Sequence, residues 1–147
     1  MNNYEFLSKV FSSRKRPKNF IDNIYFEELE EHEAVLQARN NDTISFRDVG
    51  NIAYSPISFI NLEGFLYYLP GLARLAKGVG DEYFLDTFLI FFENKRRRNS
   101  LNLDERKALL YYLLDLKTSN SSSIEKNGDC EDLNELIGWL SQRGKKG

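Results

Sequence analysis

The chain of 147 residues has few of the residue types on which many folds and active sites depend: one cysteine, one histidine and three prolines. A single cysteine, Cys130, excludes an intramolecular disulfide and fits a reducing compartment. No run of about 18 uncharged apolar residues is present, which argues against a membrane-spanning helix. Residues 1–20 lack the charged start and continuous apolar core of a secretory signal. We therefore expect a soluble, cytoplasmic, intact chain.

The single histidine, His32, limits the catalytic options. A serine or cysteine hydrolase of the usual type would need His32 as its base, and Cys130 lies in a polar stretch with no predicted helix start to activate it. Glu28 and His32 are four residues apart, but a di-iron bundle needs two Glu-x-x-His pairs on separate helices, and Leu29 stands three before His32. The spacing predicts a surface carboxylate–histidine contact on a helix. We expect no metal site, no cofactor and no catalytic residue.

The apolar residues of the chain recur at helical spacing. The composition includes 41% hydrophobic and 14% aromatic residues. No hairpin signal and no internal repeat is present, so we expect an all-α protein, an irregular single-domain bundle of about seven helices. The predicted helices cover residues 3–12, 21–39, 43–50, 61–77, 82–94, 102–117 and 132–142. Residues 118–131 are expected to form a mobile loop and residues 143–147 a frayed tail.

Some helix boundaries carry specific signals. Pro17 should end the first helix, and Pro70 should bend or stop the fourth near Leu69. Gly50 is a candidate left-handed cap, and Asp81 a candidate start of the fifth helix. The second helix should turn these residues inward: Ile21, Ile24, Tyr25, Leu29 and Leu36. Asn102 with Glu105 forms a capping box that opens the sixth helix, with Leu103, Leu110, Leu113 and Leu114 inward.

The formal net charge of −2 conceals blocks of one sign. Residues 21–42 hold seven acidic side chains and one basic, a net charge of −6. A helix brings several of these carboxylates onto one face, where they repel each other by about 0.2–0.5 kcal/mol per pair. The crowded carboxylates are Glu27, Glu28, Glu30 and Glu31. Two interpretations stay open: a solvated helix face, or a docking patch for a protein partner with a basic surface.

Two basic clusters occupy residues 14–18 and 95–98. The second would follow the end of the helix at 82–94, where cations complement the negative end of the helix dipole. Binding of nucleic acid is the alternative, but it is disfavoured by the slightly acidic total and by the absence of a Gly-rich phosphate loop. Whether the two clusters share a face is left open.

Ten of the twenty aromatic rings fall between residues 54 and 92. Most should be core, because buried rings supply large apolar areas. Tyr67 and Tyr68 are adjacent and cannot point the same way on a helix, so one should reach the surface or a groove. Together with Tyr54, Glu63 and Arg74 they could line a pocket, with packing in the core as the alternative.

The segment 45–76, SFRDVGNIAYSPISFINLEGFLYYLPGLARLA, resembles the signature segment of a family of small uncharacterised bacterial proteins. The shared features are an aromatic residue before a proline, a Glu-Gly-Phe turn and a Tyr-Leu-Pro stop. RPKNF and LNLDER resemble flanking parts, so the likeness extends over about residues 11–116. The resemblance bears on the fold and implies no chemistry, and the tail from Thr118 departs from it.

Three functions follow as hypotheses. The first is a non-catalytic protein-binding module, such as a bacterial immunity or inhibitor protein that neutralises a basic toxin or nuclease. The second is an enzyme of unrecognised type that uses the carboxylate, tyrosine and arginine pocket. The third is a nucleic-acid accessory protein that uses the basic clusters. The oligomeric state is left open.

Overall fold

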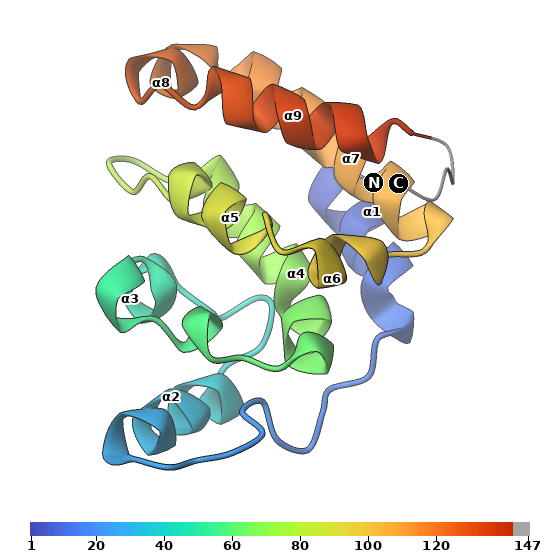
Figure 1. Cartoon of the computed structure of the whole chain (residues 1–147). Helices are drawn as coiled ribbons and strands as arrows, with labels where there is room; N and C mark the ends of the chain where they lie inside the picture. Colours follow the sequence, from blue (N-terminus) through green and yellow to red (C-terminus); the bar gives the residue numbers. More distant parts are fainter. Residues whose placement is uncertain (143–147) are drawn as a thin grey trace.

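The computed structural model describes residues 1–142, which form nine α-helices and three short 3₁₀ helices with no β-strand among them (Figure 1). The α-helices are α1 (Asn3–Val10), α2 (Glu27–Ala38), α3 (Phe46–Val49), α4 (Leu62–Lys77), α5 (Leu85–Phe91), α6 (Lys95–Asn99), α7 (Leu103–Ser119), α8 (Ser121–Lys126) and α9 (Cys130–Leu140). The all-α prediction is confirmed. The count exceeds seven because α6 separates from α5 and because α8 forms within the predicted loop. No described helix is long and apolar enough to cross a membrane.

Helix α4 lies at the centre of the molecule, with α1, α5 and α6 against it (Figure 1). Eleven of its sixteen residues are buried. Helices α7 and α9 pack together above it, and α2 lies on the opposite side (Figure 1). The core therefore runs along α4 and includes the buried rings of Phe65, Phe84, Phe88 and Phe92.

Helix α4 does not stop near Leu69, one of the two predicted effects of Pro70, because the helix continues through the proline to Lys77. Proline cannot donate to the carbonyl four residues earlier, and its ring disturbs that turn. The Asn41 side chain bonds at this turn: its Oδ1 accepts from the Gly71 amide at 2.8 Å, and its Nδ2 donates to the Tyr67 carbonyl at 2.9 Å. A Cβ at residue 71 would lie 2.9 Å from the Asn41 carbonyl, so Gly71 allows this close approach.

The second helix begins six residues later than predicted, at Glu27. The Glu33 carboxylate accepts from the amides of Phe20 and Ile21 at 2.8–3.1 Å, so this segment folds back along α2 instead of extending it. Ile21 is buried as predicted, but Ile24 and Tyr25 are exposed, which corrects their inward assignment.

Other boundaries also differ from the predictions. Asn94 accepts from the Arg97 amide and starts α6, so residues 95–98 form their own helix. Asp81 caps no helix, since α5 begins at Leu85. Gly50 follows α3 with φ −74° and is not left-handed. Gly78, with φ 79°, ends α4 as predicted.

The C-terminal part is more regular than predicted. The expected mobile loop contains α8, whose Ile124 is buried in the core, and Cys130 is the first residue of α9 rather than a loop residue. The capping box of Asn102 and Glu105 is confirmed. Leu113 is buried and Leu110 half-buried, whereas Leu103 and Leu114 are exposed. The predicted frayed tail, residues 143–147, lies outside the described residues.

Arginine side chains bind the carbonyl groups where helices end. Arg16 donates to the carbonyls of Leu36, Gln37 and Arg39 at the end of α2, at 2.7–3.0 Å. Such carbonyls have no partner within their own helix. Arg97 and Arg98 do the same at the end of α5, with the carbonyls of Phe91 and Phe92 as acceptors at 2.8 and 2.6 Å. Arg14 joins the Ser100 carbonyl, after α6, to the fully buried Glu105 carboxylate.

We predict that Asn41→Ala lowers the free energy of unfolding by about 1–3 kcal/mol, because two backbone groups at the proline turn lose their partner. In a Pro70→Ala background the turn can close by its own hydrogen bonds, so the same substitution should cost at least about 1 kcal/mol less. Urea denaturation of the four proteins in this double-mutant cycle measures both values. An equal cost of Asn41→Ala in both backgrounds would contradict the bridging role.

Candidate functional site

Four large side chains form an exposed aromatic band beside the first turn of α2. They are Tyr25, Phe26, Tyr54 and Phe59, with exposed fractions of 81%, 50%, 45% and 40%. The rings of Phe26 and Phe59 meet edge to face with centroids 6.3 Å apart. A buried ring, His32, joins the two ends of the band: it lies 5.7 Å from Phe59 and 4.5 Å from Tyr54. Phe26, Phe59 and Tyr54 are therefore connected to one another through ring contacts, and Tyr25 directly precedes Phe26 in the chain.

His32 supports this surface from beneath. Its side chain is 1% exposed, and its Nε2 lies 3.0 Å from Glu28 Oε2. The predicted contact between Glu28 and His32 is therefore present, but its assignment to the surface is wrong. The reason is that Leu29, His32 and Leu36 share the inward face of α2, where the loops that carry Tyr54 and Phe59 cover the imidazole.

The carboxylates predicted to bind a partner divide into two kinds. Glu27 and Glu30 are exposed on the outer side of α2 and make no ion pair within residues 1–142. Glu28 contacts His32, and Glu31 accepts a hydrogen bond from the Tyr54 hydroxyl, which raises the pKa of Tyr54 to about 12. Three of the four carboxylates, Glu27, Glu28 and Glu31, therefore lie around the Tyr54 end of the aromatic band.

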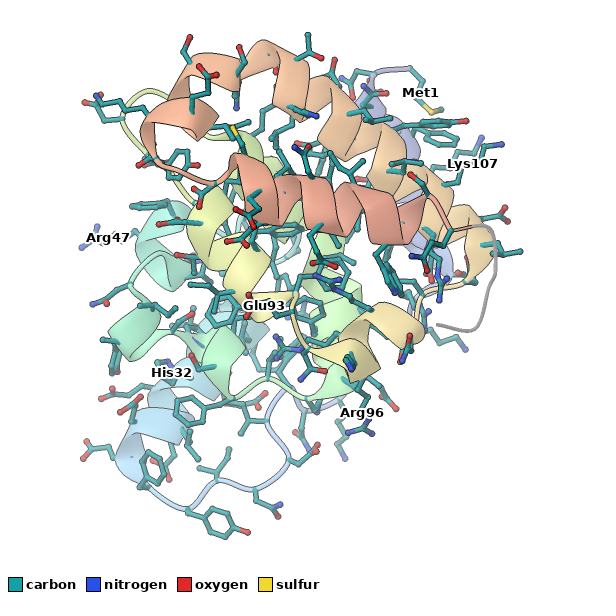
Figure 2. All side chains as sticks on the ribbon, turned by 45° about the horizontal axis from the view of Figure 1, so that its top comes forward. Met1, His32, Arg47, Glu93, Arg96 and Lys107 are labelled. Atoms are coloured by element: carbon teal, nitrogen blue, oxygen red, sulfur yellow. The ribbon has the colours of Figure 1, made fainter. Side chains whose placement is uncertain are left out.

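An open groove of about 850 Å³ lies on the other side of the band. Tyr25, Phe26 and Phe59 form part of its wall, and Lys18 and Arg96 stand at its edge. Figure 2 shows Arg96 on α6, well separated from His32 on α2. The groove thus extends from the aromatic band beside α2 to Arg96 on α6, and its charged lining contains three cations, Lys18, Arg96 and Arg97, and two carboxylates, Asp22 and Glu63.

The structure brings the two basic clusters together, since Lys18 from the first and Arg96 and Arg97 from the second line this groove. Half of their eight cations stabilise the fold, because they donate hydrogen bonds to backbone carbonyls or to carboxylates of other helices. These four are Arg14, Arg16, Arg97 and Arg98. Arg97 also lies 4.1 Å from the Phe65 ring centroid, and burial lowers the pKa of its guanidinium to about 10. The exposed cations are Lys15, Lys18, Lys95 and Arg96.

The predicted pocket of tyrosine, carboxylate and arginine side chains does not form. Tyr54 belongs to the aromatic band and Glu63 to the groove. Tyr68 is buried, and its hydroxyl donates to the carbonyls of Leu36 and Arg39 at 2.6 and 2.7 Å. Tyr67 is half-buried, as expected for one of two adjacent tyrosines, and accepts from Arg16. Arg74 donates to the carbonyls of Asn41 and Ile44, which corrects its assignment to a binding site.

Within residues 1–142 no three His, Cys, Asp or Glu side chains are placed to hold a metal ion. Comparison of the chain with protein-family models, with curated proteins and with solved structures finds no match. The resemblance of residues 45–76 to a bacterial family therefore stays a prediction. The surface geometry is the available basis for a functional proposal.

Sequence reasoning missed Phe26 and Phe59 as surface residues. A signal was present, because Ile24, Tyr25 and Phe26 are three consecutive bulky apolar residues, and one inward face of a helix does not accommodate all three. The position of Phe59 could not be found this way, because its contact with Phe26 joins residues 33 positions apart.

We predict that Tyr68→Phe lowers stability by about 1 kcal/mol at pH 7, through loss of the hydroxyl's bonds to the α2 carbonyls. Burial raises the pKa of Tyr68 to about 12 in the folded protein, above the ordinary value of 10.0. The stabilisation by this hydroxyl is then complete below pH 10 and declines as the pH rises toward about 12.

Urea denaturation of wild type and Tyr68→Phe between pH 7 and pH 11 measures this difference, because all other titrating groups cancel. Tyr67→Phe is the matched control, and it should cost less at pH 7. A stability difference for Tyr68→Phe that stays constant up to pH 11 would contradict the assignment.

Proposed function

We propose that this chain is a non-catalytic protein-binding module that docks a partner with a basic surface through the aromatic band and the outer carboxylates of α2. The observation that carries the proposal is the exposure of Tyr25, Phe26, Tyr54 and Phe59 in one connected surface. Aromatic side chains are enriched in protein interfaces and often supply most of the binding energy. Exposed apolar patches of this kind mark interaction sites.

The acidic border argues for a basic partner. Glu27 and Glu30 are exposed beside the band, and carboxylates crowded on one helix face repel each other until a cation approaches. Complementary charge speeds association and selects the partner, while the aromatic rings supply the buried area. Both parts of a protein interface, an apolar centre and a charged rim, are thus present on one side of α2.

Neutralisation of a toxic partner is the biological role that we propose for this binding. The protein would act as an immunity or inhibitor protein in a bacterial cytoplasm, where its unpaired cysteine stays reduced, and would cover the active surface of a basic toxin or nuclease. Two observations favour this role over catalysis: the side chains of the predicted pocket do not converge, and two of them, Tyr68 and Arg74, donate to backbone carbonyls. The proposal includes a single-domain organisation.

We predict that Glu27→Lys combined with Glu30→Lys weakens binding of the captured partner at least about tenfold, a loss of about 1.4 kcal/mol or more. The matched control is Glu131→Lys with Asp132→Lys, which reverses two exposed acids in the first turn of α9 and should change the affinity less than about twofold. Affinity capture from native cytosol supplies the partner, and calorimetry with the purified partner gives each dissociation constant.

The role in neutralisation needs a second measurement with the same proteins. Wild type and the α9 control should suppress the toxic or nuclease activity of the partner at equimolar ratio, and the α2 variant should not. Equal affinity of the α2 variant and the control would contradict the role of Glu27 and Glu30 in binding. A partner that binds but keeps its full activity would contradict the role in neutralisation.

A further inference from the structure

The proposed interaction surface carries opposite charges at its two ends. Glu27 and Glu30 are exposed at the α2 end. Lys18 and Arg96 are exposed in the groove: the Lys18 carbonyl accepts from Gln37 near the end of α2, and Arg96 lies on α6. With Arg97 they outnumber Asp22 and Glu63, the two carboxylates of the same lining, so this end has a net positive charge. Phe26 lies between them, because it directly precedes Glu27 in sequence and also lines the groove with Lys18 and Arg96. An acidic end, an apolar centre and a basic end therefore follow one another across a single face.

A surface with this order of charges is complementary to a copy of itself. A two-fold rotation about an axis through the aromatic band exchanges its ends, so the acidic end of each copy meets the basic end of the other. We propose that two copies of this chain pair through the aromatic band, with Glu27 and Glu30 of each copy facing Lys18 and Arg96 of the other. One contact is formed twice, which doubles the effect of each charge pair.

The apolar centre gives this pairing its driving force. Tyr25 is 81% exposed and Phe26 50% exposed, so each copy can remove both rings from water against the same rings of the other. Burial of apolar area contributes about 25 cal/mol per Å², whereas exposed ion pairs contribute about 1 kcal/mol or less. The rings therefore supply most of the affinity and the charges fix the orientation. The net charge of −2 per copy opposes association only slightly.

Self-association rests on the proposed function, because it uses the same surface, but it also requires residues that binding of a basic partner does not use. Binding of a basic partner uses the acidic end and the band, whereas self-association also requires Lys18 and Arg96. A second copy and a basic partner would occupy Glu27 and Glu30 in turn, so they compete. Loss of the basic end should abolish pairing and leave partner binding intact, which separates failure of this inference from failure of the proposed function.

The test is a charge exchange between two variants of the full chain. The acid-reversed variant carries Glu27→Lys and Glu30→Lys, and the base-reversed variant carries Lys18→Glu and Arg96→Glu. Sedimentation equilibrium at about 100 μM protein should show a wild-type dimer whose dissociation constant rises in about 0.5 M NaCl, where the charge pairs are screened. Each variant alone should be monomeric, because like charges then face each other at both contacts. A 1:1 mixture should form a heterodimer, because opposite charges face each other again at both contacts.

Two controls keep the result interpretable. Lys117→Glu with Lys126→Glu makes the same change in net charge as the base-reversed variant, at exposed positions on α7 and α8, and should leave the dimer intact. Heterodimer formation itself shows that both reversed variants are folded, and circular dichroism checks each one separately. A wild type that is monomeric at this concentration, a reversed variant that still dimerises, or a mixture that stays monomeric would each overturn the inference.

Discussion

The fold depends on partners for the carbonyl groups at the ends of its short helices. Every α-helix leaves its last four carbonyls without a partner in the helix, and short helices have a larger share of such groups. Glycine caps commonly solve this problem, but α2, α5 and α6 are followed by Arg39, Phe92 and Ser100. Arginine side chains take the place of the missing caps: Arg16 at α2, Arg97 and Arg98 at α5, and Arg14 at α6.

This use of arginine explains the segregation of charge along the chain. A guanidinium group can donate to several acceptors in one plane, so one Arg16 side chain can bind three carbonyls at the end of α2. The basic cluster at 95–98 was expected to complement the negative end of the preceding helix. It does so through Arg97 and Arg98, although these residues belong to a separate helix, α6. Half of the cations in the clusters that suggested a partner therefore hold the fold together.

The sequence was sufficient for features that depend on neighbouring residues. Helical spacing gave the all-α class, and Asn102 with Glu105 gave the start of α7. The sequence was insufficient where a contact from a residue distant in the chain changes where a helix begins or ends. Pro70 does not break α4, because Asn41, 29 positions earlier, bonds at the disturbed turn. The helix predicted from Ile21 starts at Glu27, because Glu33 binds the amides that would have continued it.

In the candidate site, too, the features set by neighbouring residues were predictable and those set by distant contacts were not. Local charge identified Glu27, Glu28, Glu30 and Glu31, and the structure leaves all of them except Glu28 exposed on α2. The five residues of the predicted pocket do not line one cavity: the Tyr67 hydroxyl accepts from the Arg16 side chain, the Tyr68 hydroxyl donates to the Leu36 carbonyl, and Arg74 donates to the Asn41 carbonyl. The aromatic band could not be predicted, since it joins residues 25–26 to residues 54 and 59 through His32.

The contacts that complete the helices also create the proposed interaction surface. Arg16 and Glu33 tie the segment before α2 to the body of that helix, and Asn61 donates its amide to the Phe20 carbonyl at 2.7 Å. With its start held in this way, the chain passes residues 22–26 across the outside before α2 begins. Tyr25 and Phe26 then lie on the surface, although their composition alone would place them in a core. A longer α2 would bury more apolar area, but it would remove the ring and carboxylate surface on which the proposed docking depends.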